Sequence, residues 1–273
     1  MDLFDLTFVK SEFELHGLRI DTLAFDKESS AFVIIEYKKD RNFSVVDQGV
    51  AYLNLMLNNR SDFIIEYNEV FSSQPLKRGG VDWSQSRIIF IAPEFTRHQQ
   101  YAIGFKDLGI QLWEVHKYSN DLIVFNEAKS PFTKEPLATI AKRNPVAKKI
   151  TEEIKVYSEE DHLKGVGEKI KELYQITKDK ILSLGYDIEI KTNKTYIAFR
   201  RKHNFAAIRV TKSFLKLHLL IKKSELHDPS NKVRDIGGHL HVSGLTEVII
   251  KEPNEIHYVL PFIQQSYNKN LTW

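Results

Sequence analysis

The stretch FVIIEYKKD, residues 32–40, constrains the fold of this chain more than any other. From Phe32 to Tyr37 every residue except Glu36 is apolar or aromatic, a run typical of a strand buried on both faces of a sheet. Glu36 and Lys38 are two residues apart, so their side chains lie on the same face of that strand, where it ends. Because burial alone gives no reason for an acid and a base there, the pair is a candidate for function.

The segments around this strand follow the pattern of a mixed α/β fold. Ser44 and Asp47 are spaced as in a capping box, which marks the start of a helix. The predicted elements of the first half are strands at 8–15, 18–25 and 31–38, a helix from 44 to 58, a helix at 61–70, a strand at 87–92, a helix at 96–108 and a strand at 110–116. Strands that bracket helices in this way indicate an α/β sheet.

The charge of the chain changes sign near residue 130. Residues 1–130 carry 14 Lys+Arg against 19 Asp+Glu, a net of −5, and residues 131–273 carry 25 against 17, a net of +8. The asymmetry suggests that the second half holds a polyanion, although a solvated basic surface would give the same counts. Three prolines then mark a linker at 128–157 between a domain at 1–127 and a basic α+β domain at 158–273.

The second domain is predicted to contain an antiparallel sheet and two long helices. Its predicted elements are a helix at 158–184, strands at 187–191, 195–200, 206–210, 215–221 and 246–250, and a helix at 253–267. Arg200, Arg201 and Lys202 form a basic turn flanked by Phe199 and Phe205. Such a turn could hold phosphates with its cations and stack bases on its aromatic rings, or it could be a solvated hairpin tip above two core phenylalanines.

Several classes of protein are excluded by composition. The chain has no cysteine, which rules out disulfides, thiolate chemistry and cysteine-ligated zinc. No apolar run approaches the roughly 18 residues of a membrane-spanning helix. The acidic start MDLFDLTFVK does not have the pattern of a secretory signal. We therefore expect a cytoplasmic protein without a membrane partner.

Acids on neighbouring predicted strands suggest a metal site. Counting outward from the tight turn after Leu15 places Glu12 opposite Asp21, and two like charges opposed on a ladder destabilise it unless a cation lies between them. Together with Glu36, these acids make an oxygen-rich site suited to Mg²⁺ or Mn²⁺. Lys38 could orient an attacking water or stabilise charge at a phosphate, so the pattern indicates phosphodiester cleavage.

The same residues resemble a known motif. Asp21, followed after fourteen residues by Glu36-Tyr37-Lys38, resembles the D…ExK core of the PD-(D/E)XK nuclease superfamily, and residues 8–125 are most similar to the catalytic domain of NucS-type endonucleases. Gln48 and Tyr52 resemble the QxxxY element of RecB-type members. The resemblance implies a restriction-endonuclease-like mixed sheet flanked by helices. The second domain resembles an uncharacterised α+β module found after such domains.

The resemblance also implies roles for individual residues. Asp21 and Glu36 would ligate the metal, with the carbonyl of Tyr37 as a further ligand and either Glu12 or Glu14 as a third acid. Lys38 would position the water and Gln48 would organise the site. Tyr52 would support the site or touch the nucleic acid.

The function implied is that of a metal-dependent endonuclease that hydrolyses phosphodiester bonds in DNA, in repair or genome defence. The second domain would grip the substrate through residues such as Arg200, Arg201 and Lys202. The alternative is a catalytically inactive nucleic-acid-binding or adaptor protein on the same fold. Related nucleases are often dimers, so a homodimer is compatible with either function.

Overall fold

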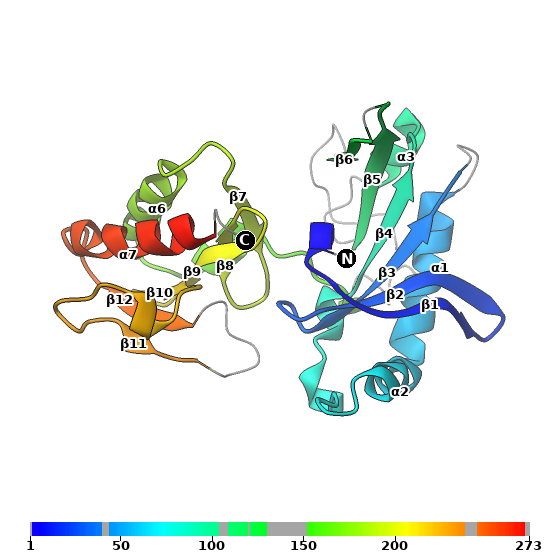
Figure 1. Cartoon of the computed structure of the whole chain (residues 1–273), viewed down its shortest axis with the longest axis horizontal. Helices are drawn as coiled ribbons and strands as arrows, with labels where there is room; N and C mark the ends of the chain where they lie inside the picture. Colours follow the sequence, from blue (N-terminus) through cyan, green and yellow to red (C-terminus); the bar gives the residue numbers. More distant parts are fainter. Residues whose placement is uncertain are drawn as a thin grey trace. The chain divides into compact units, whose positions relative to one another are not determined.

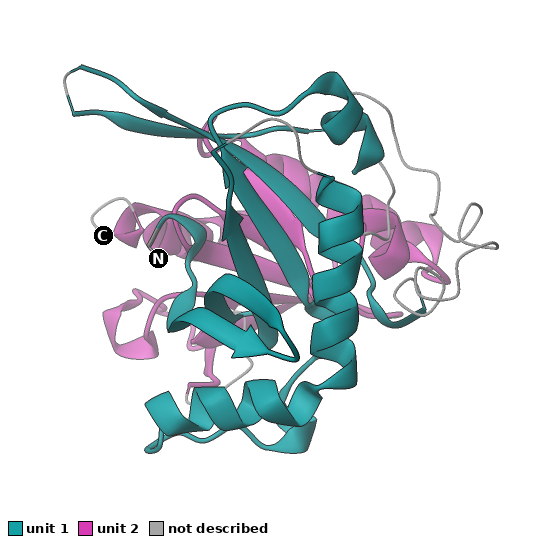
Figure 2. Ribbon diagram, turned by 90° about the vertical axis from the view of Figure 1, so that its right-hand side faces the viewer, with its two compact units in different colours: residues 1–156 teal, residues 157–273 magenta. Residues whose placement is uncertain are grey.

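In the computed structural model the chain forms two compact units, residues 1–156 and 157–273 (Figure 2). The structure describes residues 2–39, 44–103, 109–119, 121–129, 152–237 and 245–270. Most of the predicted linker lies outside these residues. Its last part belongs to the first unit, because Ile154 is buried in that unit's core and the N–H of Lys155 donates to the carbonyl of Ser84 (2.8 Å).

The first unit is a mixed α/β structure, as predicted (Figure 1). Its sheet has the strand order β1-β2-β3-β4-β5-β6, in which β3, β4 and β5 are parallel and the other neighbours are antiparallel. The elements are η1 Asp2–Phe4, β1 Thr7–Leu15, β2 Leu18–Asp26, β3 Ala31–Tyr37, α1 Val45–Asn58, α2 Arg60–Val70, η2 Arg78–Gly80, η3 Trp83–Gln85, β4 Arg87–Ala92, α3 Arg97–Ala102, β5 Ile110–Lys117 and β6 Ile123–Glu127.

The β1–β2 hairpin turns at His16 and Gly17, as the sequence predicts. Both residues have positive φ angles, 51° and 77°, as the tightest hairpin turns require, and the glycine adopts this conformation without steric penalty. Leu15 and Leu18 pair directly across the turn. The turn therefore sets the register that carries the acids of β1 and β2.

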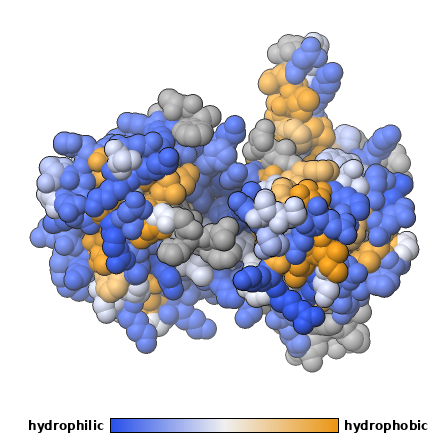
Figure 3. All heavy atoms as spheres, turned by 60° about the horizontal axis from the view of Figure 1, so that its bottom comes forward, coloured by the Kyte–Doolittle hydropathy of each residue, from blue (hydrophilic) through white to orange (hydrophobic). Residues whose placement is uncertain are grey.

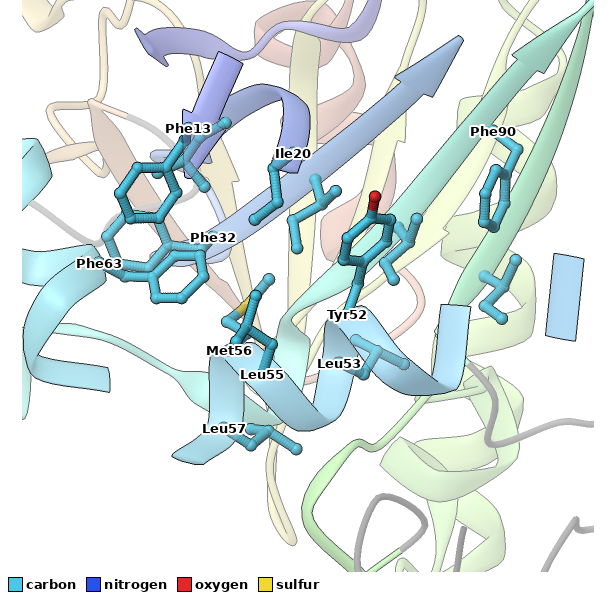
Figure 4. Close-up of a cluster of buried hydrophobic side chains, with 14 of the residues drawn as sticks. Phe13, Ile20, Phe32, Tyr52, Leu53, Leu55, Met56, Leu57, Phe63 and Phe90 are labelled. Carbon is cyan, nitrogen blue, oxygen red and sulfur yellow. The ribbon is translucent and has the colours of Figure 1, made fainter. Parts of the chain in front are cut away.

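Strand β3 is buried on both faces, which confirms the interpretation of its apolar run. Phe32 and Ile34 face α1 and α2, and Val33 and Ile35 face a smaller cluster on the opposite side of the sheet. Phe32 lies edge-on to Phe63 of α2, with ring centroids 5.7 Å apart (Figure 4). Helix α1 packs on the face of the sheet that carries Phe32 and Ile34. Side chains in the first turns of α1 are therefore directed at the end of β3.

Some boundaries in the first unit differ from those predicted. The segment at 61–70 is helical, as predicted, and forms α2. The helix predicted for 96–108 is the shorter α3, because the chain leaves the helix after Ala102; residues 104–108 lie outside the described part. Strand β6 was not predicted.

The second unit is an antiparallel sheet with α6 and α7 packed together on one face (Figure 1). Its strand order is β11-β12-β10-β9-β8-β7. The predicted helix at 158–184 is divided into α5 and α6, with Gly165 (φ 72°) at the break. The elements are α5 Glu159–Leu163, α6 Glu168–Leu182, β7 Glu189–Thr192, β8 Ile197–Arg200, β9 Asn204–Val210, β10 Leu215–Leu219, η6 Lys223–Glu225, β11 Arg234–Asp235, β12 Thr246–Ile250 and α7 Glu255–Lys269.

The surface of the molecule is mainly hydrophilic on the face shown in Figure 3, with apolar side chains in patches. Three exposed large apolar side chains, Tyr118, Leu122 and Ile123, lie on the β5–β6 hairpin. In the described part of the chain, no helix combines the length and the apolar character needed to cross a membrane.

Candidate functional site

Asp21 and Glu36 meet where strands β2 and β3 separate. The regular pairing of these strands runs from Asp26–Ala31 to Thr22–Ile35, and the next opposing residues are the two acids. The N–H of Asp21 donates to Oε1 of Glu36 (3.0 Å), and the N–H of Tyr37 donates to Oδ2 of Asp21 (2.9 Å). Each carboxylate is therefore held by the backbone of the opposite strand, which brings the predicted acids together.

Glu36 is a buried acid with one basic side chain beside it. The carboxylate is 2% exposed, and Nζ of Lys38 lies 3.2 Å from its Oε2. Burial raises the pKa of Glu36, and the charge of Asp21 raises it further. The hydrogen bond from the N–H of Asp21 and the ammonium of Lys38 act in the opposite direction without cancelling the rise.

Helix α1 contributes Gln48 and Tyr52 to the same site. Nε2 of Gln48 donates to the hydroxyl of Tyr52 (3.2 Å), which donates to the carbonyl of Arg19 (2.8 Å). Tyr52 points from α1 towards the strands (Figure 4). Burial, and then the charge of Glu36, raises the pKa of Tyr52 to about 12. The tyrosine is 4% exposed, so its burial favours the supporting role over contact with a nucleic acid.

The sequence next to Gln48 explains how the helix comes so close to the sheet. Gly49 is buried, and a Cβ atom at that position would lie 2.3 Å from Cδ1 of Ile110 on β5. Ser44 caps the helix by accepting a hydrogen bond from the N–H of Asp47 (3.2 Å), as predicted. Cap and glycine together fix where Gln48 and Tyr52 meet the strands.

Glu12 is not brought into contact with the other acids. It lies opposite Asp21, between the pairs Ser11–Thr22 and Phe13–Ile20, as the hairpin count predicts. Its backbone is left-handed (φ 53°), and its carboxylate forms an ion pair with Nε of Arg19 (2.9 Å). Arg19 was not singled out from the sequence as a residue near the site, although it stands two residues before Asp21 on the same strand.

Tyr37 takes part through its backbone. Its side chain lies on the face opposite to Glu36 and Lys38 and is 52% exposed at the end of β3. In the described part of the chain, no group of three or more His, Cys, Asp and Glu side chains is placed to hold a metal ion. Two carboxylates with a nearby carbonyl still suit Mg²⁺, which usually keeps several waters and takes one or two protein carboxylates.

The structure decides between the two interpretations of the basic turn in the second unit. Phe199 and Phe205 are fully buried in the core, which confirms that they are core phenylalanines and shows that the base-stacking alternative is wrong. The guanidinium of Arg201 pairs with Asp187 and lies over the ring of Tyr267, 5.4 Å from its centroid. Two partners distant in sequence therefore hold this arginine.

The other two cations of the turn are differently placed. A terminal nitrogen of Arg200 donates to the carbonyl of Lys202 (2.9 Å), and Lys202 itself is exposed. These two residues remain the cations of the turn that could reach a phosphate.

Comparison with known proteins relates the whole chain to one bacterial protein. The chain is 45% identical over 260 residues to a protein of Haemophilus influenzae (strain ATCC 51907 / DSM 11121 / KW20 / Rd), described as an uncharacterized protein. The alignment covers 95% of this chain and 86% of that protein. This chain belongs to the same family.

The second unit also matches a family model of its own. Residues 159–270 match the model of a domain of unknown function, DUF5655. The match begins at α5 and ends just after α7, so it covers the described elements of that unit. No solved structure matches the chain.

Proposed function

We propose that this protein is a metal-dependent endonuclease of the PD-(D/E)XK type, which hydrolyses phosphodiester bonds in DNA. The observation that carries the proposal is the pair of opposed carboxylates, in which Glu36 accepts the N–H of Asp21 and Asp21 accepts the N–H of Tyr37, with Lys38 beside Glu36. Gln48 and Tyr52 reach the same place from the next helix. These are the five side chains that the D…ExK and QxxxY motifs would bring together.

The arrangement of elements supports the same proposal. The acids lie on β2 and β3, β3 runs parallel to β4 and β5, and α1 and α2 pack on the face that carries Glu36. A restriction-endonuclease-like domain is a mixed sheet of this kind, flanked by helices. A surface ion pair at a strand end would explain Glu36 and Lys38 alone, but it would not explain a glutamate that is 2% exposed and opposed to a second acid.

The residues of the site have distinct parts in the proposed hydrolysis. Asp21, Glu36 and the carbonyl of Tyr37 would hold Mg²⁺ or Mn²⁺, which supplies Lewis-acid polarisation of a phosphate oxygen and activation of water. Lys38, whose ammonium already lies beside Glu36, would orient the water for in-line attack on phosphorus. Tyr52 keeps its proton at neutral pH and fixes β2 through the carbonyl of Arg19.

The second unit would hold the nucleic acid. The half of the chain that contains it carries a net charge of +8, and Arg200 and Lys202 offer cations at the β8–β9 turn. Phosphate contacts of this type position a substrate without reading its sequence. The role would be in DNA repair or genome defence.

The proposal is tested by cleavage of labelled single-stranded, duplex and flap DNA with Mg²⁺ or Mn²⁺. Asp21→Ala and Lys38→Ala should each abolish cutting. Asp47→Ala removes an exposed acid from the first turn of α1 and should retain cutting, because its side chain lies outside the contacts of the site. DNA binding without cutting by the wild type, equal in all variants, would instead support the inactive nucleic-acid-binding alternative.

A further inference from the structure

Glu12 and Arg19 form an ion pair on β1 and β2, the hairpin that carries Asp21 of the two-acid site. Arg19 is two residues before Asp21 on β2, and its carbonyl accepts the hydrogen bond from Tyr52. Nε of Arg19 lies 2.9 Å from Oε2 of Glu12, and the two side chains are 60% and 57% exposed. The backbone of Arg19 is therefore fixed by the site, while its side chain stays open to solvent.

The backbone of Glu12 is unusual for its residue type. A φ of 53° is the left-handed conformation, which is uncommon and unfavourable for residues other than glycine. Glu12 lies opposite Asp21, and its carboxylate contacts Arg19 instead of the acid across the ladder. An ion pair this exposed contributes little to stability, so stability does not account for the strained conformation.

The two-acid site needs a nearby cation that can bind a phosphate of the nucleic acid. The first half of the chain has a net charge of −5, and two of the acids in that count, Asp21 and Glu36, lie where a phosphate would have to approach. Lys38 is engaged with Glu36. An arginine is well suited to bind phosphate, because its guanidinium offers several N–H donors in a fixed plane.

We propose that Arg19 binds a phosphate of the nucleic-acid backbone next to the one that is cleaved, and that Glu12 holds the guanidinium in place until that phosphate replaces it. The inference rests on the proposed function. In this proposal Glu12 competes with the DNA phosphate for Arg19, whereas a metal ligand would assist the reaction. Removal of the Arg19 side chain should therefore weaken DNA binding, and removal of the Glu12 side chain should strengthen it.

The test measures binding of a short fluorescein-labelled DNA duplex and of its single strand by the full chain, using anisotropy in EDTA at several salt concentrations. Arg19→Ala should raise Kd about tenfold, as expected for a lost charged hydrogen bond. The slope of log Kd against log salt should fall by about one. Glu12→Ala should lower Kd about two- to fivefold, the range of an exposed ion pair.

Lys10→Ala is the matched control, because it breaks another ion pair of β1, with Glu66 (2.8 Å). Its Kd and its salt slope should match those of the wild type. The same proteins are then assayed for cleavage with Mg²⁺. In that assay Glu12→Ala should cut subsaturating DNA at least as fast as the wild type, since it binds DNA more tightly and the inference gives Glu12 no part in holding the metal.

Two results would overturn the inference while leaving the nuclease intact. One is a wild type that cuts DNA together with an Arg19→Ala variant whose Kd and salt slope equal those of Lys10→Ala. The other is a Glu12→Ala variant that has lost both cutting and Mn²⁺ binding measured by calorimetry, which would make Glu12 the third acid of the metal site. A wild type that neither binds nor cuts DNA would refute the proposed function and this inference together.

Discussion

Asp21 and Asp26 lie five residues apart on β2, and their conversion to asparagine should change the stability of the first unit in opposite directions. Asp26 is 2% exposed, pairs with the guanidinium of Arg87 (2.8 Å), and accepts hydrogen bonds from the N–H groups of Glu28 (2.9 Å) and Ser29 (3.1 Å). Asp21 accepts a backbone N–H but opposes a second acid, Glu36.

The magnitudes follow from these contacts. Asp26→Asn leaves the largely buried Arg87 without its carboxylate, so the free energy of unfolding should fall by about 2–3 kcal/mol, somewhat less than for a fully buried pair. Asp21→Asn keeps an oxygen for the N–H of Tyr37 and removes the repulsion with Glu36, which should stabilise the unit by about 1 kcal/mol.

Urea unfolding at pH 7.5 in EDTA would measure both changes, because EDTA prevents a metal from stabilising the wild type alone. Trp83, whose ring stacks on Phe32 with centroids 5.5 Å apart, provides a fluorescence signal for the first unit. With a slope of about 2 kcal/mol per molar urea, the midpoint of Asp26→Asn should fall by about 1–1.5 M and that of Asp21→Asn should rise by about 0.5 M. An Asp21→Asn variant as unstable as Asp26→Asn would show that Asp21 is a structural acid and would refute the reasoning.

Three further perturbations test other contacts. Because burial raises the pKa of Glu36, the stability that this group contributes is complete below pH 4.5 and is lost as pH rises through the raised pKa. Glu36→Gln should remove this pH dependence of the free energy of unfolding, measured by urea titrations between pH 4.5 and 7. Burial lowers the pKa of His218, although Glu247 opposes the shift, so its contribution is present above pH 6.5 and lost as pH falls through the lowered pKa. His218→Gln should flatten the thermal stability of the second unit over that window, as calorimetry would show. Tyr52→Phe should destabilise the first unit by about 1 kcal/mol in urea unfolding, since the carbonyl of Arg19 loses its donor, and an unchanged midpoint would contradict that contact.

Local chemistry made much of the first unit predictable. The buried run at Phe32–Ile35, the His16-Gly17 turn and the cap at Ser44 each depend on residues close together in sequence, and the structure has all three. The position of Glu12 opposite Asp21 followed from the same turn. Its backbone conformation did not, because a left-handed glutamate has no signature in a pattern of apolar and polar residues.

Features that depend on partners distant in sequence were not predictable. Arg201 looked like a free cation of a basic turn, yet Asp187 and Tyr267 hold it from fourteen and sixty-six residues away. The sequence left open whether Phe199 and Phe205 stack bases or belong to the core, and alternation along the strands directs both into the core. A residue type and its neighbours in sequence show what a side chain can do, whereas its tertiary partners decide whether it is available.

The tertiary surroundings of Asp21 and Glu36 also determine how the two-acid site affects the stability of the fold. Glu36 and Asp21 oppose one another at the point where a backbone ladder would otherwise continue, and there each carboxylate accepts a backbone N–H of the opposite strand in place of a carbonyl. Burial of Glu36 adds a desolvation penalty that a glutamine or a leucine at this position would avoid. The two opposed acids therefore weaken the fold at one end of the β2–β3 pairing, whereas Asp26 and Arg87 strengthen it at the other end. An arrangement that lowers stability, keeps both acids and adds a lysine is the one expected when the carboxylates are retained to bind a cation.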